Sequence, residues 1–262
     1  CVLVGAPVGH QLAIFTYIAS VVVACASLFV AARLVSPQLR HAVRDVPRLK
    51  VAPSVRVMNT AGPMLVQMLA LPVAMQTARI LISHLSGSAQ LAEYNLGSQL
   101  FGIALQTISA AGIVLWPMYA RARAINSIDS PFLPTAWFLV GGLVLGGGMA
   151  VLTPWLTELT SGGVLHLSPL LVAAFIAFIA VQATKYPVGM YMTDARGLRF
   201  QVVPTIVMIP ISLGLSLWLI PTLGAAGSVL AVTVAVVLCQ VMPNLLYVRS
   251  DLRRRRREAD TP

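Results

Sequence analysis

The sequence predicts an all-α, polytopic membrane protein: a helical bundle of about seven transmembrane helices. Hydrophobic residues make up 58% of the 262 residues and charged residues only 10%, a composition outside the soluble globular range. Seven apolar stretches each have about the 20 residues that a helix needs to cross a hydrocarbon core. Almost every charged residue lies between or after them. The stretches are residues 11–33, 57–83, 95–118, 132–154, 167–185, 200–220 and 224–247.

The basic residues lie in alternate connections, and this pattern predicts the topology. The chain carries 18 Lys and Arg against 8 Asp and Glu, a net charge of +10. The connections 84–94, 155–166 and 221–223 contain no Lys or Arg. Because basic connections stay in the cytoplasm, the N-terminal end is predicted outside and the C-terminus inside. This topology accounts for the Arg run at 253–257, so no nucleic-acid partner is expected.

Four segments are predicted along the chain. Residues 1–33 form one helix, 34–56 a basic cytoplasmic linker, 57–248 a compact six-helix lobe, and 249–262 a basic cytoplasmic tail. The linker lies either at the membrane interface near anionic headgroups or in solvent as a loop that only sets topology. Because the chain begins with Cys1 and has an odd number of stretches, we expect a longer protein that continues N-terminally.

Two stretches carry polar side chains at helical spacing. Gln76 and Arg79 share a face of the stretch 57–83, and the stretch 95–118 carries Asn95, Gln99 and Gln106. A polar face this long does not suit lipid. It either hydrogen-bonds to another helix or lines a hydrophilic passage.

Arg79 and Lys185 are the basic residues whose role the sequence leaves open. Arg79 lies about four residues from the outer end of its stretch. It either extends towards the interface or faces a wet cavity, where a guanidinium suits phosphate oxygens. Lys185, one turn after Gln182, is either an interface anchor or the inner rim of the same passage.

Several sequence features disfavour an enzymatic function for this chain. No stretch interior is expected to hold Asp or Glu, so no proton relay is expected here. There is no phosphate-binding loop and no H-E-x-x-H motif, and the cysteines are scattered. We therefore expect no catalytic residue, metal or cofactor. The alternative is a membrane enzyme that acts on lipid-linked sugars with outer-side residues, namely His84, Glu93, Glu158 and His166.

Six short motifs, in this order and spacing, resemble one family. They are Gln76–Arg79 (QTAR), Leu91–Asn95 (LAEYN), Gln99–Phe101 (QLF), Leu115–Ala122 (LWPMYARA), Gly197–Gln201 (GLRFQ) and Gly224–Ser228 (GAAGS). Together they resemble the polysaccharide flippases of the multidrug/oligosaccharidyl-lipid/polysaccharide exporter superfamily. The resemblance covers roughly residues 57–250.

The resemblance implies twelve helices in two six-helix lobes around a central cavity. This chain would supply the last helix of the first lobe and the complete second lobe. The implied activity is translocation of an undecaprenyl-diphosphate-linked oligosaccharide to the outer leaflet of the bacterial cytoplasmic membrane, by alternating access. The implied partners are this lipid, membrane lipids and the N-terminal lobe.

Two points of the resemblance leave alternatives. Members often carry Asp before the arginine, where this chain has Ala78. This difference either frees Arg79 for an anionic ligand or marks another mode of coupling. The resemblance also covers a drug or ion-coupled exporter of the same superfamily, and the path residues that it suggests are Gln76, Arg79, Asn95, Gln99, Gln106, Gln182 and Lys185.

Overall fold

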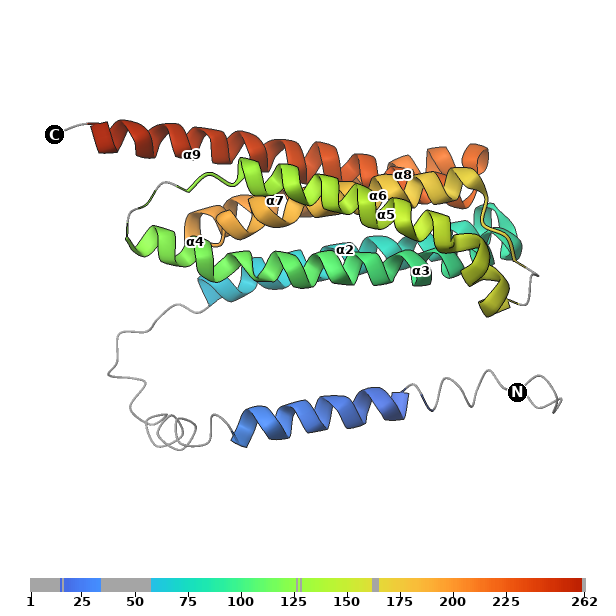
Figure 1. Cartoon of the computed structure of the whole chain (residues 1–262). Helices are drawn as coiled ribbons and strands as arrows, with labels where there is room; N and C mark the ends of the chain where they lie inside the picture. The colour runs from blue at the N-terminus through green and yellow to red at the C-terminus, as the bar shows by residue number, and fades with distance from the viewer. Residues whose placement is uncertain are drawn as a thin grey trace. The chain divides into compact units, whose positions relative to one another are not determined.

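All regular secondary structure that the computed structural model describes is helical (Figure 1), which confirms the all-α fold class. The described residues are 15, 17–33, 58–125, 127, 129–161 and 165–260. Among them, six helices are long and apolar enough to cross a membrane, so the chain is a multi-pass membrane protein. The chain divides into two units, Cys1–Arg56 and Val57–Pro262.

The first unit contains a shorter apolar helix, Tyr17–Arg33. It covers most of the first predicted stretch, whose residues 11–14 and 16 lie outside the described residues, as does the predicted linker 34–56. The Arg33 guanidinium lies 4.7 Å from the centre of the Phe29 ring, a cation–π contact. At 1.5 Å per residue the described helix is about 25 Å long.

The second unit contains the six predicted spans of the lobe, and their helices extend beyond the apolar stretches. Two spans are composite, since α3 continues into α4 and α8 continues through a π-helical turn, η2, into α9. The helices are α2 (Met58–Leu85), α3 (Gly87–Ile113), α4 (Leu115–Ala124), α5 (Phe132–Ser161), α6 (Pro169–Tyr191), α7 (Ala195–Leu223), α8 (Ala225–Val236), η2 (Val237–Val241) and α9 (Met242–Asp260).

Two of these boundaries differ from the prediction for physical reasons. The third helix begins at Gly87 rather than near residue 95, because Gly87 has a φ of 84° that permits a tight turn directly after α2. The last helix continues to Asp260, since arginine is a good helix former and the membrane surface does not end a helix. The first eight residues of α3 and the Arg run are therefore helical.

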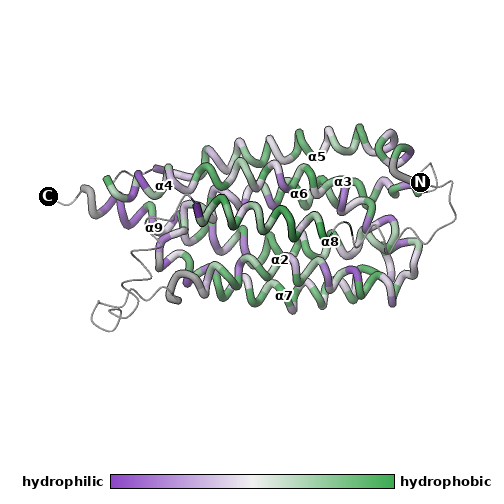
Figure 2. Tube along the Cα trace, turned by 90° about the horizontal axis from the view of Figure 1, so that it is seen from below, coloured by the Kyte–Doolittle hydropathy of each residue, from purple (hydrophilic) through white to green (hydrophobic). Residues whose placement is uncertain are grey.

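The helices of the second unit connect alternately at two ends (Figure 1). One end holds α4, the turn between α6 and α7, and the C-terminal part of α9; we call it the basic end. Hydrophilic residues gather there along α4 and α9 (Figure 2). The other end, which we call the opposite end, holds the turns α2–α3, α5–α6 and α7–α8. Their predicted connections contain no Lys or Arg, so the charge alternation along the sequence corresponds to two ends of one bundle.

Helix α6 lies against α3 and α5, and glycines permit the close approach. A Cβ atom on Gly142 of α5 would lie 2.8 Å from Ala183 Cβ and 3.1 Å from the Ala180 Cα. One turn further, Gly146 faces Ile176. Small residues spaced four apart bring membrane helices together. Helix α6 in turn buries Leu171, Phe175 and Phe178, which form part of the core of the lobe.

The turn between α7 and α8 depends on Gly224 and on a side chain from α3. Gly224 has φ 58° and ψ −138°, a conformation open in practice to glycine alone. Gln90 of α3 accepts a hydrogen bond from the Ala225 backbone N–H at 2.8 Å through its Oε1. One of the free N–H groups at the start of α8 is thereby satisfied, and α3 is tied to the hairpin.

We predict that Gly224→Ala lowers the free energy of unfolding by about 1–3 kcal/mol, because a Cβ strains this backbone conformation and meets the Gln90 side chain. Gly214→Ala is the matched control. Gly214 lies inside α7 with nothing within 4 Å of an added Cβ, so alanine should be neutral or stabilising there. Thermal unfolding in detergent compares the two variants. Equal stability would contradict the role given to Gly224.

Candidate functional site

Tryptophans mark the levels at which the lobe meets the two membrane interfaces. Trp137 and Trp155 of α5 are 68% and 62% exposed. They are separated by five helical turns and share a face, about 27 Å apart. This distance is close to the ~30 Å hydrocarbon thickness. Trp116 near the basic end and Trp218 near the opposite end are also exposed. Because tryptophan concentrates at both interfaces, these positions define a depth scale.

Arg79 lies below the interface at the opposite end. The Ser86 hydroxyl donates to the Ile220 carbonyl at 3.3 Å, so these two residues are level. Arg79 precedes Ser86 by seven residues, whereas Trp218 precedes Ile220 by two. Since α2 and α7 run towards the same end (Figure 1), Arg79 is about 7 Å deeper than Trp218.

The Arg79 side chain points away from the nearer interface. Its Nη1 donates to Gln76 Oε1 at 3.3 Å, and Gln76 is almost one turn deeper in the membrane. Its Nε is buried without a hydrogen-bond partner. Tyr94 of α3 is close enough to Arg79 for an electrostatic interaction. These contacts disfavour extension of the Arg79 side chain towards the nearer interface, and the wet cavity stays a prediction.

Helix α3 exposes a different kind of surface from α5 and α7. Its exposed positions include polar and small side chains, and its large apolar members there are Ile103, Ile113 and Val114. Asn95 is half-buried on the flank of this surface. By contrast, α5 exposes Leu143, Val144, Val151 and Leu152 along its length, and α7 exposes Val203, Ile206, Leu213 and Leu217. Beyond its first turn, the polar and small exposed residues of α3 are Gln99, Gln106, Thr107, Ala110 and Ala111; we call them the α3 polar face.

Gln182 and Lys185 lie on α6, away from the α3 polar face. Gln182 is 1% exposed, and its Nε2 has no hydrogen-bond partner. Lys185 is half-buried beside Tyr186, which packs where Gly112 leaves room on α3. The sequence had placed Lys185 at the end of its helix. Because α6 continues to Tyr191, Lys185 instead lies within the helix. The structure therefore pairs Gln76 with Arg79 and exposes Gln99 and Gln106 on one helix, whereas Gln182 is buried on α6.

Glu93 corrects one expectation from the sequence. Since α3 begins at Gly87, Glu93 lies inside a helix that is apolar enough to span the membrane. Its Oε2 is buried without a hydrogen-bond partner. The placement of Glu93 in the connection 84–94 is therefore wrong. The interiors of the predicted apolar stretches, including 95–118, contain no Asp or Glu, as expected from the sequence.

The enzyme alternative relies on His84, Glu93, Glu158 and His166, and no hydrogen bond recorded for them joins one to another. His84 Nδ1 lies 2.8 Å from the Ile80 carbonyl of its own helix and 3.1 Å from Ser83 Oγ. Glu158 and His166 are exposed. Among the described residues, no group of three or more His, Cys, Asp or Glu side chains could hold a metal ion.

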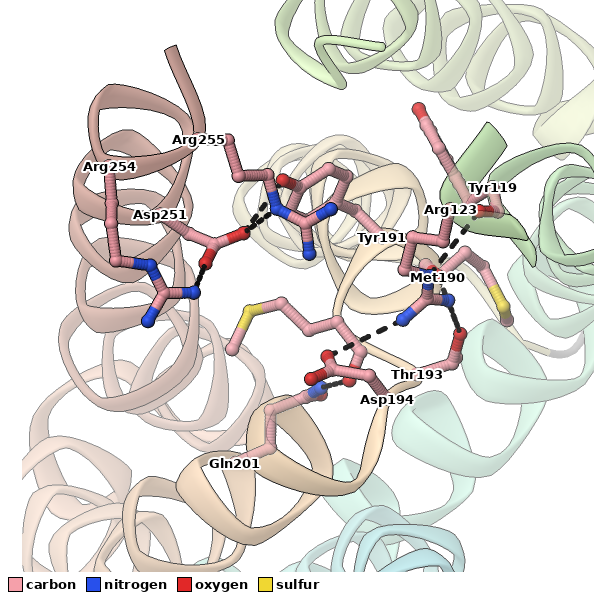
Figure 3. Close-up of polar contacts among 11 residues, drawn as sticks. Tyr119, Arg123, Met190, Tyr191, Thr193, Asp194, Gln201, Asp251, Arg254 and Arg255 are labelled. Carbon is pink, nitrogen blue, oxygen red and sulfur yellow. Dashed lines mark hydrogen bonds and ion pairs between the residues drawn. The ribbon is translucent and has the colours of Figure 1, made fainter. Parts of the chain in front are cut away.

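A polar network at the basic end was not predicted from the sequence (Figure 3). Asp251 of α9 is 8% exposed and accepts hydrogen bonds from the Tyr191 hydroxyl at 2.9 Å, from Arg254 Nη2 at 2.6 Å and from Arg255 Nε at 2.8 Å. A buried carboxylate with this many donors is well compensated. The contact with Tyr191 fixes α9 to the end of α6.

Arg123 of α4 forms a second part of this network (Figure 3). Its Nη2 donates to Thr193 Oγ1 at 2.8 Å, and its Nη1 lies 3.4 Å from Asp194 Oδ1. These contacts fasten α4 to the turn between α6 and α7. The three arginines of the network bind its two acids, Asp194 and Asp251. The network therefore holds the basic end together and is not an open ligand site.

A small cavity lies between four helices of the lobe. It has a volume of about 10 Å³, lies between α2, α3, α6 and α8, and is lined by Met75, Tyr94, Phe175, Phe178, Ser228, Val229 and Val232. This volume holds about one water molecule and excludes a sugar. This cavity is therefore no site for a large ligand, and the exposed α3 polar face is the candidate.

Comparison with known proteins adds no assignment. No family model, curated protein or solved structure matches the chain. What the protein does has to follow from its own residues.

Proposed function

We propose that the chain is part of a transporter that moves an undecaprenyl-diphosphate-linked oligosaccharide from the cytoplasmic to the outer leaflet of the bacterial cytoplasmic membrane. One observation carries this proposal: α3 exposes the amides of Gln99 and Gln106 on either side of Ile103, whereas the exposed side chains along α5 and α7 are mainly leucine, isoleucine and valine. Lipid cannot satisfy amide groups. A surface of this kind therefore borders water, a polar ligand or another protein surface.

Arg79 of α2 would add an affinity for phosphate to a passage beside this surface. A guanidinium binds two phosphate oxygens at once; the Arg79 Nε is buried, so its terminal nitrogens would make these contacts. Gln76 holds the side chain towards the membrane interior. The uncharged amides of Gln99 and Gln106 suit the hydroxyl groups of sugars, which both donate and accept hydrogen bonds.

The path for so large a substrate needs a second wall. The cavity enclosed by this lobe holds one water molecule, so the passage would form between the α3 polar face and an N-terminal lobe of the kind that the sequence resemblance implies. Rocking of the two lobes would open the passage to each leaflet in turn. The basic end would lie in the cytoplasm, by the positive-inside rule.

The test uses proteoliposomes containing the full-length protein and a fluorescent undecaprenyl-diphosphate oligosaccharide. A quencher added outside reports which leaflet the lipid occupies. We expect faster exchange between leaflets than in empty liposomes, and slower exchange with Gln99→Leu/Gln106→Leu. The control is Val144→Leu on the apolar face of α5, which should behave like the unmodified protein. Exchange no faster than in empty liposomes would contradict the proposal.

A drug or ion-coupled exporter of the same superfamily is the second candidate, and Glu93 favours it. A carboxylate buried in an apolar helix is costly and is typical of cation or proton pathways. The test is uptake of a fluorescent cationic dye by the same proteoliposomes under an imposed proton or sodium gradient. Dye transport that is lost in Glu93→Gln, without exchange of the lipid-linked oligosaccharide, would favour this candidate.

A further inference from the structure

One exposed face of α9 changes from apolar to basic along its length. Met242 and Leu246 are 54% and 66% exposed, and the next positions on the same face are Arg249, Arg253 and Arg256, all exposed. Successive members are three or four residues apart, so they form one stripe. A lipid-facing helix shows this change where it passes from the hydrocarbon core into the headgroup layer.

Helix α7 shows the same change at the same level. Val203 is 64% exposed and Phe200 36%, and the exposed Arg199 and Arg196 follow towards the basic end. The Phe200 ring lies 4.7 Å from the ring of Tyr247 on α9, centre to centre. Phe200 and Tyr247 are therefore level, and both helices place their first arginine within three residues beyond this aromatic pair.

The exposed arginines at this end are distinct from those of the Asp251 network. Arg123, Arg254 and Arg255 bind Asp194 or Asp251, so they are committed to the fold. Asp194 and Asp251, the two acids of this network, are thus already paired with arginines. The exposed arginines without a recorded partner among the described residues are Arg121 of α4, Arg196 and Arg199 of α7, and Arg249, Arg253 and Arg256 of α9; we call them the arginine collar.

We propose that the arginine collar binds the phosphate groups of anionic phospholipids in the leaflet at the basic end. The depth agrees with this occupant. Arg249 lies about 4.5 Å beyond the lipid-facing Leu246, and Arg253 about 6 Å further. These two side chains therefore fall within or just beyond a headgroup layer that is roughly 5–7 Å thick on each side. Arg256 lies beyond it, still within a Debye length of the surface.

Continuity with the lipid-facing surface favours lipid over a nucleic acid or an acidic protein. The basic stripe of α9 directly continues the apolar stripe of Met242 and Leu246, so a ligand that covers Arg249 also lies against the bilayer. The Tyr191 hydroxyl and two arginines hold Asp251, and this keeps α9 fixed to the lobe at that point. The basic stripe of α9 therefore keeps a fixed position relative to the lobe, and this suits binding to a planar layer of phosphate groups.

The test measures lipid binding to the purified full-length protein in detergent by native mass spectrometry. We expect phosphatidylglycerol to bind at least 10-fold more tightly than phosphatidylcholine. The triple variant Arg249→Gln/Arg253→Gln/Arg256→Gln should lose about 10- to 100-fold of this affinity, because each basic residue near an anionic surface contributes about a factor of five. The matched control Arg249→Lys/Arg253→Lys/Arg256→Lys keeps the charge and should retain most of it.

Three results would overturn the proposal. Equal binding of the two lipids would remove the preference for anionic headgroups. An unchanged phosphatidylglycerol affinity in the glutamine variant, with the same thermal stability as the unmodified protein, would place the lipid elsewhere. Displacement of the lipid by millimolar inorganic phosphate, or tighter binding of an RNA duplex than of phosphatidylglycerol, would assign the collar to a soluble anion or a nucleic acid.

Discussion

Arg79→Ala is expected to slow transport of a lipid-linked oligosaccharide about 10- to 100-fold while the protein remains folded. Arg79 lies about 7 Å below the level of Trp218 along the helix axis, and Gln76 accepts a hydrogen bond from its Nη1. Charge-assisted hydrogen bonds to a phosphate contribute about 1.5–3 kcal/mol, which sets the size of the effect. Leaflet exchange in proteoliposomes measures it.

Two further variants separate charge from position. Arg79→Lys keeps the charge but loses the bidentate geometry, so we expect an intermediate rate. Ser83→Ala, one turn along the same helix, removes a hydroxyl that bonds only within α2 to the Ile80 carbonyl and His84, and it should transport normally. Normal transport by Arg79→Ala would show that the arginine serves only to position α2 in the membrane.

The second large effect concerns the contact between α5 and α6. Gly142→Leu is expected to lower the free energy of unfolding by about 3 kcal/mol, because even a single Cβ would lie 2.8 Å from Ala183 Cβ and 3.1 Å from the Ala180 Cα. Backbone atoms of α6 cannot move aside as a flexible side chain can. The expected fall in thermal midpoint in detergent is roughly 6–12 °C for a chain of this size.

Gly148→Leu is the matched control, since it adds the same side chain to the same helix. Gly148 is exposed, and nothing lies within 4 Å of an added Cβ. Substitutions at such positions usually change stability by less than about 0.5 kcal/mol. If the two variants melted at the same temperature, α5 and α6 would not pack through Gly142.

The six spans of the lobe were predictable because apolar length alone identifies a membrane helix, but their ends were not. Gly87 starts α3 eight residues before the predicted boundary, and this moves Glu93 from a connection into the helix. Hydropathy could not show this, since residues 87–94 are only moderately apolar. The tight turn and the contact between Gln90 and Ala225 decide it, and both need the neighbouring hairpin.

Helical spacing also identified polar residues that share a face, as with Gln76 and Arg79. The spacing of polar residues does not predict which helix faces are buried in the lobe. Gln182 is therefore inside the lobe, whereas Gln99 and Gln106 are exposed. The bond between Tyr191 and Asp251 joins residues far apart in the chain, so only the packing of α6 beside α9 reveals it.

The most direct test of the account is the water accessibility of the α3 polar face. Gln99→Cys and Gln106→Cys would be introduced into a cysteine-free full-length protein and exposed to a membrane-impermeant thiol reagent in intact vesicles. Val144→Cys on α5 is the control, since Val144 is 67% exposed and near the middle of an apolar face. Labelling of both α3 positions, slowed by the lipid-linked oligosaccharide, with none at Val144, is the predicted result. Failure to label either α3 position, as at Val144, would show that lipid or protein covers this face and that no passage runs along it.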